Sequence, residues 1–321
     1  MKAIVYTKYG PPDVLELREV AKPTPKDNEV LVKVHAVSAN AADIHLLRGT
    51  PFLFRLSAGL LKPKKQIIGA DIAGRVEAVG NNVTQFQAGD EVFGDILPRL
   101  GGFAEYVRAR ESALALKPAS MTFEEAAAIP QAAVIALQGI RDKGRVQPGQ
   151  KVLVNGAGGG AGTFAVQLAK LYGAEVTGVD NTGKLNFMRS LGADHVIDYT
   201  REDFTRDGKQ YDLIFDVVAH RSIFAYKRAL RSNGSYFLAG GSVATILQIL
   251  LLGAWIRATT GKEIRILAVQ PNTEDVDYMK ELIEAGKVTT VIDRTYPLSE
   301  VPDAIGYVGE GHAKGKVVIT M

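Results

Sequence analysis

The segment VLVNGAGGGAGTFAVQLAKLYGAEVTGVD, from Val152 to Asp180, carries the clearest fold pattern of this chain. It opens with an apolar run without alternation, which is typical of a strand buried on both faces of a parallel sheet. Five glycines fall within the seven residues after Asn155, and a helical segment follows that ends at Gly173. A second strand ends at Asp180. Strand, glycine-rich turn, helix and strand together predict a βαβ unit whose turn binds a phosphate group.

Strand and helix signals continue to alternate after this unit. A helix is predicted over 184–192, a third strand over 195–198, and a helix over 222–234 between two later strands. Further strands are predicted over 211–218, 234–240 and 263–269. This alternation predicts a doubly wound parallel sheet of the Rossmann type, which we place at residues 122–267.

The first 120 residues follow a different pattern. Their short strands are rich in Val and Ile and are separated by Pro, Gly, Asn and Asp turns, which suits an antiparallel, barrel-like domain. Ser120 is a candidate helix cap, and Pro130 interrupts the helix that follows it. A helix and the strand GKVVITM close the chain, so the predicted substrate domain comprises residues 1–121 and 268–321.

The composition is that of a globular protein and excludes several functions. Of 321 residues, 46% are hydrophobic and 23% are charged. The net charge of +3 comes from scattered Lys and Arg, so we expect no nucleic-acid partner. The absence of cysteine removes disulfides, catalytic thiols and thiolate metal sites. The N-terminus shows no apolar leader, so we expect a cytoplasmic protein.

The segment VATILQILLLGAWI at residues 243–256 is apolar enough to raise the question of a membrane span. Its length of about 14 residues is short for a membrane span, which needs about 20. We therefore expect a buried or interface helix and no membrane span. Its bulk also suits a lid or wall that selects hydrophobic substrates.

The glycines after the first Rossmann strand predict a dinucleotide site. A helix N-terminus offers N–H groups without intrahelical partners and the positive end of the helix dipole, and both attract phosphate. Gly159 and Gly160 let the backbone approach a pyrophosphate, and Gly162 allows helix and strand to pack closely. The strict Gly-x-Gly-x-x-Gly fingerprint is not met in that register, because Ala157 stands at its first position.

The residues expected beside the adenosine ribose give opposing signals. Asp180, at the end of the second strand, suits the ribose hydroxyls and disfavours a 2′-phosphate. Thr182, Lys184 and Tyr199 supply a hydroxyl, an ammonium and an aromatic face, which suit a phosphorylated ribose beside an adenine. These residues by themselves leave NAD(H) and NADP(H) both open.

Over its whole length the chain resembles the medium-chain dehydrogenase/reductase superfamily. Where the zinc alcohol dehydrogenases of that superfamily carry Gly-His-Glu, this chain has Gly69-Ala70-Asp71, and Asn40 stands at the position of the first zinc cysteine. The Cys-rich lobe that binds structural zinc has no counterpart. Without those thiolates and the imidazole we expect no catalytic zinc, and therefore no alcohol oxidation.

Seven motifs in order make the resemblance more specific. SANAAD, GGFAEYV, NGAGGGAG, GADHVIDY, DVV, PLSEVPDAI and GHAKGKVVI are similar to those of the zinc-free quinone oxidoreductases. The resemblance implies a GroES-like β domain beside the Rossmann domain, NADP(H) as the favoured cofactor, and a homodimer joined through edge strands, with EIRILAV as the candidate edge.

The same resemblance implies a set of site residues. Asn40 and Asp43 fall where the family builds its substrate and nicotinamide pocket, and Lys184 and Tyr199 match the pair that contacts a 2′-phosphate. The full set of candidate cofactor contacts is Gly156, Gly159, Gly160, Gly162, Asp180, Thr182, Lys184, Tyr199, Val217, Gly240 and Gly241.

We expect hydride transfer from a nicotinamide to a quinone or a similar conjugated acceptor, without a covalent step. Asn40 and the backbone around Gly240 and Gly241 would position the reactants. One alternative is an enoyl or alkene reductase, which needs a proton donor such as His45 or Tyr106. A second alternative is a redox sensor that binds the nucleotide without useful turnover.

Overall fold

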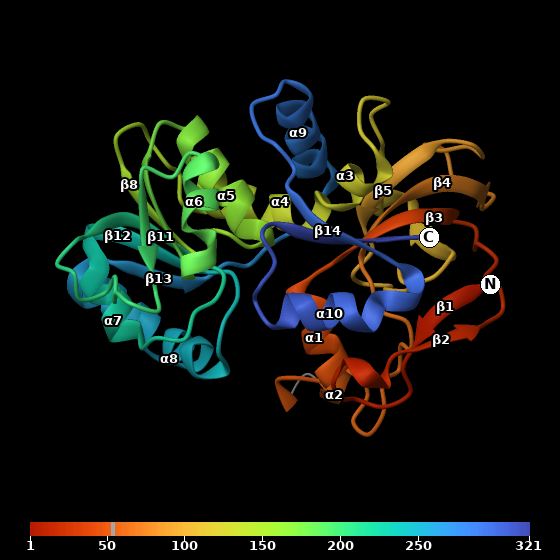
Figure 1. Cartoon of the computed structure of the whole chain (residues 1–321), viewed down its shortest axis with the longest axis horizontal. Helices are drawn as coiled ribbons and strands as arrows, with labels where there is room; N and C mark the ends of the chain where they lie inside the picture. The colour runs from red at the N-terminus through yellow and green to blue at the C-terminus, as the bar shows by residue number, and fades with distance from the viewer. Residues whose placement is uncertain (53–54) are drawn as a thin grey trace. The chain divides into compact units, whose positions relative to one another are not determined.

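The computed structural model describes residues 1–52 and 55–321 and divides into two compact units (Figure 1). The first unit comprises Met1–Gln131, Pro271–Glu284 and Thr290–Met321, and the second comprises Ala132–Gln270 and Ala285–Thr289. The first boundary thus follows Gln131 rather than residue 121. The reason is that α3 (Phe123–Ala127) packs against strands of the first unit.

The second unit is built on a sheet of six parallel strands in the order β10-β9-β8-β11-β12-β13. The strands are β8 (Lys151–Asn155), β9 (Glu175–Asp180), β10 (His195–Asp198), β11 (Tyr211–Asp216), β12 (Leu230–Leu238) and β13 (Glu263–Ile266). This confirms the predicted doubly wound sheet. The chain reverses its direction across the sheet between β8 and β11, and such a switch point is where dinucleotides bind.

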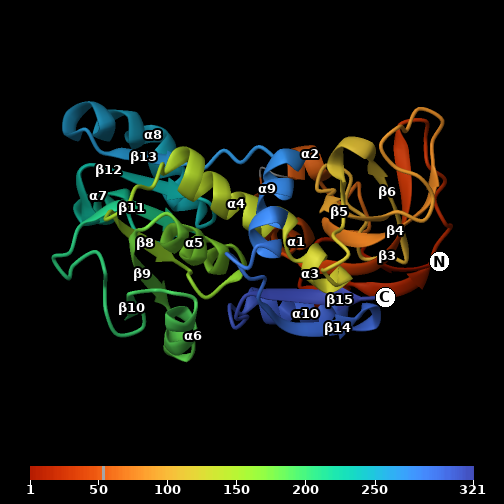
Figure 2. The same cartoon turned by 90° about the horizontal axis from the view of Figure 1, so that it is seen from above.

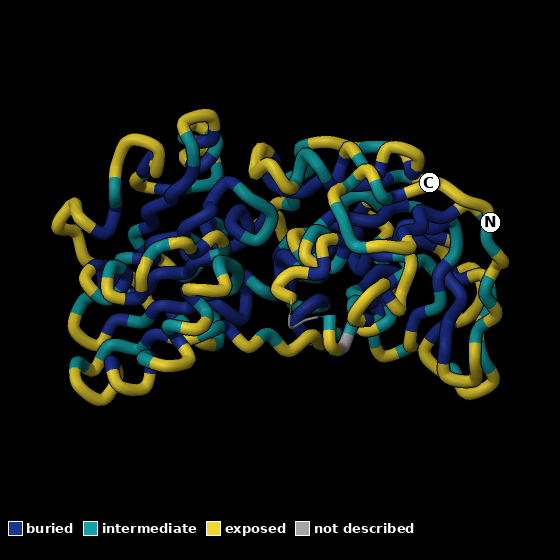
Figure 3. The backbone as a smooth tube through the Cα atoms, turned by 90° about the horizontal axis from the view of Figure 1, so that it is seen from below, coloured by how far each residue is buried: buried dark blue, intermediate teal, exposed yellow. Residues whose placement is uncertain are grey.

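Helices cover both faces of this sheet. α5 (Gly160–Leu171) and α6 (Leu185–Ser190) lie on one face, and α7 (Ile223–Ala229) and α8 (Val243–Thr260) lie on the other (Figures 1 and 2). α4 (Pro130–Leu137) leads into the unit and continues as a π-helical turn over Gln138–Lys143. The central strands β8, β9 and β11 are almost entirely buried (dark blue in Figure 3), because helices cover both of their faces.

The first unit holds a seven-stranded sheet in the order β14-β15-β3-β4-β5-β7, with β6 also paired to β3. Its strands are β3 (Glu29–Ala39), β4 (Asp71–Val79), β5 (Glu91–Asp95), β6 (Tyr106–Arg110), β7 (Ala115–Leu116), β14 (Ile292–Pro297) and β15 (Lys316–Thr320). All pairs except β14–β15 are antiparallel. A separate antiparallel pair joins β1 (Lys2–Val5) and β2 (Glu16–Glu19).

Four more helices belong to the first unit: α1 (Ala41–Arg48), α2 (Arg55–Ala58), α9 (Thr273–Glu284) and α10 (Val301–Gly309). Its core combines strand residues such as Val32 and Ile72 with Leu47 of α1 and Ile305 of α10. A mainly antiparallel β domain with helices at its ends confirms the second part of the predicted fold class.

Two local predictions are wrong in detail. Thr122, not Ser120, caps α3: its side chain accepts a hydrogen bond from the Glu125 N–H at 3.1 Å, and the Glu125 carboxylate accepts one from the Thr122 N–H at 2.9 Å. The helix predicted over 222–234 ends at Ala229, because Leu230 already pairs with Tyr211 of the neighbouring strand.

The apolar segment of residues 243–256 is longer than its composition suggested. α8 extends over 18 residues, and by length and composition alone this helix could cross a membrane. Its inner face is buried, but only 22% of the helix is buried in total. Of the expected buried or interface helix, burial therefore holds for one face, and the other face is exposed.

Candidate functional site

The glycine turn after β8 has the close backbone packing that its sequence predicts. Gly156 has a φ of 82°, and a Cβ atom there would lie 2.5 Å from Cγ2 of Val217. A Cβ atom on Gly162 would lie 2.0 Å from the carbonyl oxygen of Gly156. Both positions therefore require glycine, since no side-chain atom fits at either distance.

The first turn of α5 is available to an anion. Gly159 is its N-cap residue, and no side chain caps this helix end. The first N–H groups of a helix have no partner within the helix, and the dipole is positive there. A Cβ atom on Gly159 would meet only the Gly156 carbonyl oxygen, at 3.4 Å, so open space lies above it. These features fit the pyrophosphate of a dinucleotide.

The other predicted backbone contacts lie at the same edge of the sheet. Val217 directly follows β11, and its N–H donates to the Asn155 carbonyl oxygen at 3.1 Å. Gly240 and Gly241 follow β12; Gly240 accepts from the Ala219 N–H at 3.0 Å, and Gly241 forms a parallel bridge with Ala219. The carboxyl ends of three adjacent strands, β8, β11 and β12, therefore carry the predicted cofactor positions.

Asp216, the last residue of β11, supports this edge and was not singled out from the sequence. Its buried carboxylate accepts hydrogen bonds from Asn155 Nδ2 at 2.9 Å, from the Val218 N–H at 3.0 Å and from the Tyr236 hydroxyl at 3.1 Å. Burial raises the pKa of Asp216 to about 6, against these donors. An acidic residue before two valines gave no signal of this role, because its partners come from two other strands.

The two residues that give opposing cofactor signals contact each other. Asp180 and Lys184 are both buried, and Lys184 Nζ lies 3.4 Å from Asp180 Oδ1. The other Asp180 oxygen accepts a hydrogen bond from the Gly158 N–H at 3.0 Å, so this carboxylate faces the glycine turn. A Cβ atom on Gly158 would lie 2.6 Å from Lys184 Cδ, which places the lysine stem directly against the turn.

The neighbouring polar residues lie beside this ion pair. The Thr182 hydroxyl donates to Asp198, which also accepts from the Thr200 hydroxyl at 2.7 Å. Hydrogen bonding to Thr182 holds the pKa of Asp198 below its usual range. Tyr199 follows β10 with half of its surface exposed, 50%, and is therefore accessible to a ligand.

In the first unit, the strand register brings a polar cluster to one edge of the sheet. Val317 of β15 pairs with Ala39 of β3, and Asp71 of β4 pairs with both Ser38 and Asp95. Lys316, Asn40, Asp71 and Asp95 therefore end up together although they are far apart in the chain. We refer to these four residues with Asp43 as the acid–lysine cluster.

Asn40 lies at the centre of the acid–lysine cluster. Its Oδ1 accepts a hydrogen bond from Lys316 Nζ at 2.6 Å, and its Nδ2 donates to Asp71 Oδ2 at 3.0 Å. Lys316 Nζ also lies 3.7 Å from Asp71 Oδ2. The orientation of the Asn40 amide is thus fixed at both ends by buried charged groups. Asp95 and Lys316 were not predicted, because only strand register places them here.

Burial shifts the protonation of this cluster. It raises the pKa of Asp71 to about 7, opposed by the Lys316 ammonium, and raises the pKa of Asp43 to about 6. Burial also lowers the pKa of Lys316, opposed by Asp71. Carboxylates that titrate near neutral pH can hold or release a proton there.

The predicted catalytic residues Asp43 and His45 occupy different environments on α1. Asp43 is fully buried, and its oxygens accept from the Asn40 N–H at 2.8 Å and the Gly69 N–H at 3.0 Å. This geometry caps the helix and fixes the loop that carries Gly69. His45 is exposed, with Nδ1 3.4 Å from the Thr50 hydroxyl, so its ring is accessible to a proton acceptor. Tyr106 is the other candidate donor, and the Lys22 ammonium lies over its ring, 3.8 Å from the ring centre.

The residues at the former zinc position have the wrong chemistry for zinc. Asn40, Ala70 and Asp71 replace the thiolate, imidazole and carboxylate, and the Lys316 ammonium lies among them. Within residues 1–52 and 55–321 no group of three or more His, Asp or Glu side chains is arranged to hold a metal ion.

Both halves of the sequence match models of known families. Residues 26–119 match the alcohol dehydrogenase GroES-like domain, and residues 191–319 match the zinc-binding dehydrogenase family. A curated relative, the chloroplast envelope quinone oxidoreductase homolog of Arabidopsis thaliana, is 35% identical over 99% of this chain and 98% of its own length. The chain belongs to the zinc-free quinone oxidoreductases of the medium-chain dehydrogenase/reductase superfamily.

Two further comparisons agree with this quinone oxidoreductase family. The NADPH-dependent alkenal/one oxidoreductase of Arabidopsis thaliana chloroplasts is 34% identical over 99% of this chain and 79% of its own length. The solved structure of the quinone oxidoreductase from Coxiella burnetii superposes with a TM-score of 0.91 and 30% identity, covering 100% of this chain and 99% of that one. The family makes this chain an oxidoreductase, and a nicotinamide cofactor fits its glycine turn.

Proposed function

We propose that the protein is a zinc-independent NAD(P)H:quinone oxidoreductase. A quinone, NAD(P)H and one proton give a hydroquinone and NAD(P)⁺. The observation that carries the proposal is the glycine turn at the switch point between β8 and β11, with an uncapped helix directly behind it. When bound, the nicotinamide supplies the hydride. The protein positions the two reactants and keeps water from the reacting atoms.

For the cofactor, we propose a preference for NADP(H). Lys184 can exchange its contact with Asp180 for a 2′-phosphate, and the exposed Tyr199 can pack against the adenine. The Asp180 carboxylate accepts a hydrogen bond from the Gly158 N–H and pairs with Lys184, so both of its oxygens already have partners where NADH would present a ribose hydroxyl. The preference for NADPH therefore depends on Lys184, and Asp180 limits its strength.

Binding measurements by calorimetry test this preference without turnover. Lys184→Met should weaken NADPH binding roughly 10- to 100-fold, the value of one hydrogen bond to a charged group, and leave NADH binding within about threefold. Lys209→Met, at an exposed lysine of the same unit, is the matched control and should change neither. If Lys184→Met weakens the binding of NADPH and NADH equally, Lys184 does not contact the 2′-phosphate.

On the substrate side, Asn40 would position the acceptor carbonyl or the nicotinamide. Lys316 and Asp71 hold its amide in one orientation, so a ligand meets a preorganised group. Asn40→Ala should lower turnover more than it lowers cofactor affinity. Unchanged turnover in this variant would contradict the role.

The alternative of an alkene reductase depends on a proton donor. The exposed His45 on α1 is the accessible candidate, because a reduced enone needs a proton at its α-carbon, whereas a hydroquinone anion takes one from solvent. His45→Phe should slow reduction of enones and leave reduction of quinones unchanged if the protein acts on both. Equal rates of the wild type and variant on enones exclude His45 as donor.

One assay separates these activities from the sensor alternative. NADPH and NADH oxidation are followed with a panel of small quinones and one enone. Fast oxidation with quinones supports the reductase, and oxidation with the enone alone supports the alkene reductase. Cofactor binding without oxidation by any acceptor supports the nucleotide-binding sensor.

We also propose a homodimer joined at β13. This strand is the last of the six-stranded sheet and pairs with β12 on one side only among the described residues. An open edge strand is a site for pairing with a second copy. Sedimentation that shows a monomer at micromolar concentration would contradict this assembly.

A cytoplasmic location stays a prediction. Two relatives are named as chloroplast proteins, so an organelle is the alternative location. Fractionation of the source cells would test the prediction directly.

A further inference from the structure

Helix α8 exposes an apolar stripe on the surface of the second unit. Its members recur at helical spacing, with Leu250 and Leu251 adjacent in the chain, and each is 45–77% exposed: Val243, Leu247, Leu250, Leu251 and Trp255. We call these five residues the α8 stripe. The opposite face is also apolar, since Ile249 and Ile256 are buried in the core of the unit.

A helix that is apolar on both faces is normally covered on both faces. Here the inner face is held by α7 and by β12 and β13. Phe224 of the adjoining α7 is 51% exposed as well. A contiguous exposed patch of large apolar side chains marks a site of interaction with a partner or a membrane.

The charged residues of the segment that carries the α8 stripe have one sign, and the next charged residues, Glu263 and Arg265 of β13, pair with each other. Residues 217–262, which carry α7, β12 and α8, contain six Lys and Arg and no Asp or Glu. Two of the cations border the stripe: Arg257 is exposed in the last turn of α8, and Lys227 Nζ of α7 lies 5.7 Å from the ring of Trp255. The stripe is therefore apolar with a basic rim.

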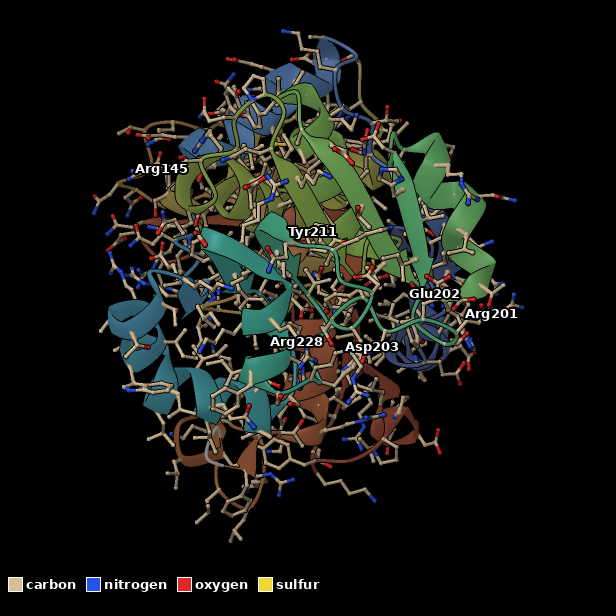
Figure 4. All side chains as sticks on the ribbon, turned by 90° about the vertical axis from the view of Figure 1, so that its left-hand side faces the viewer. Arg145, Arg201, Glu202, Asp203, Tyr211 and Arg228 are labelled. Carbon is tan, nitrogen blue, oxygen red and sulfur yellow. The ribbon has the colours of Figure 1, made fainter. Side chains whose placement is uncertain are left out.

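The remaining four cations of this segment are directed at the second unit itself. Lys262 Nζ donates to the carbonyl oxygens of Lys227 at 2.9 Å and Leu230 at 2.6 Å. Arg228 donates to the Thr205 carbonyl oxygen at 2.8 Å, in the loop that also holds Asp203 (Figure 4). Arg221 pairs with Asp203 at 2.7 Å, and Arg231 pairs with Asp212 at 2.9 Å. Arg257 and Lys227 thus lie closest to whatever covers the stripe.

We propose that the α8 stripe docks on an anionic lipid surface. Leucines and a tryptophan enter the boundary between headgroups and acyl chains, and a basic rim is attracted to anionic headgroups. A second copy meeting the same face would bring Arg257 and Lys227 of both chains together, which like charge opposes. Because Ile249 and Ile256 stay in the core, α8 lies parallel to the surface and does not cross it.

The test uses the whole chain and vesicles of stated composition. Co-sedimentation is measured with vesicles of phosphatidylcholine alone and of phosphatidylcholine mixed with phosphatidylglycerol. Trp255 is the only tryptophan of the sequence, so its emission reports directly on this face. We expect binding to the anionic vesicles, a shift of the emission to shorter wavelength, and weaker binding at high salt.

Substitutions on the exposed face locate the contact. Leu251→Gln with Trp255→Gln should lower the partition coefficient at least tenfold, and Arg257→Gln should lower it several-fold. Leu61→Gln, at an 89% exposed leucine of the first unit, is the matched control and should leave binding unchanged. Circular dichroism of each variant checks that the fold is kept.

Three results would overturn the proposal. The first is no co-sedimentation and no emission shift with anionic vesicles. The second is binding that the α8 substitutions leave unchanged. The third is a dimer in sedimentation velocity that Leu251→Gln dissociates, because a second copy would then cover the stripe.

Discussion

Replacing Asp216 by Asn should change how the stability of the protein depends on pH. Asp216 ends β11 and is fully buried, with hydrogen bonds from Asn155, Val218 and Tyr236. Burial raises its pKa from 3.8 to about 6. The folded state therefore holds the carboxylate ion less favourably than the unfolded chain does.

The size of the effect follows from linkage. Below pH 4 the group is protonated in both states, so the raised pKa has no cost there. Above pH 6 the carboxyl group is ionised in both states. The rise of its pKa from 3.8 to about 6, at 1.36 kcal/mol for each pH unit, then lowers the free energy of unfolding by about 3 kcal/mol. Asn has the same shape, keeps an oxygen for Asn155 and Val218, and has no charge. Relative to the wild type, Asp216→Asn should thus gain about 3 kcal/mol in unfolding free energy between pH 4 and pH 7.

Urea unfolding of both proteins at intervals from pH 4 to pH 7 measures this difference. Asp43, Asp71 and Asp95 also titrate, but they are present in both proteins and cancel in the comparison. Asp207→Asn, at an exposed carboxylate of the same unit, is the control and should stay within about 0.5 kcal/mol of the wild type throughout. If the difference in unfolding free energy between Asp216→Asn and the wild type is constant across this range, the pKa of Asp216 is not raised by burial.

Three further substitutions test other parts of the structure. Gly162→Ala should abolish NADPH binding and cost about 1–3 kcal/mol of stability, because its Cβ would lie 2.0 Å from a carbonyl oxygen; Gly306→Ala, with no atom within 4 Å, is the calorimetric control. Lys316→Met should lower the free energy of unfolding, measured in urea, by about 3–5 kcal/mol at pH 8. The loss should be smaller at pH 5, because the raised pKa values of Asp71 and Asp43 let both carboxylates take up protons there. An equal loss at both pH values would show that unpaired buried carboxylates are not its cause. Asp180→Asn should tighten NADPH binding several-fold in calorimetry by releasing Lys184, and an unchanged affinity would show that the ion pair does not limit it.

The strands and helices of the Rossmann unit could be predicted because each is indicated by residues that are close together in the sequence. A continuous apolar run, a glycine turn and a helix stop follow one another within the stretch Val152–Asp180. The errors are local as well. Thr122 rather than Ser120 caps α3, because the capping box needs Glu three positions later and Glu125 stands there. The predicted helix after Ser222 is cut short at Leu230, because strand pairing overrides helix propensity.

The acid–lysine cluster depended on information that no local pattern carries. Asn40 and Asp71 drew attention because they replace zinc ligands, but Asp95 and Lys316 did not. Whether Lys316 meets Asn40 depends on the register between β15 and β3, which are separated by most of the chain. A shift by one residue would turn the lysine to the other face of the sheet.

Local residue patterns were enough to predict the two-domain α/β fold and the dinucleotide turn, because each follows from residue types at short spacing. The loss of zinc ligands came from the family resemblance, which shows what stands at Asn40 and Gly69–Asp71. The folded structure adds that Asp180 and Lys184 pair with each other, that Asp216 supports the carboxyl end of the sheet, and that one face of α8 is exposed. Those outcomes depend on which strands are neighbours and on which side chains burial takes out of water. Neither the order of the strands in the sheet nor the burial of a side chain can be read from local sequence patterns.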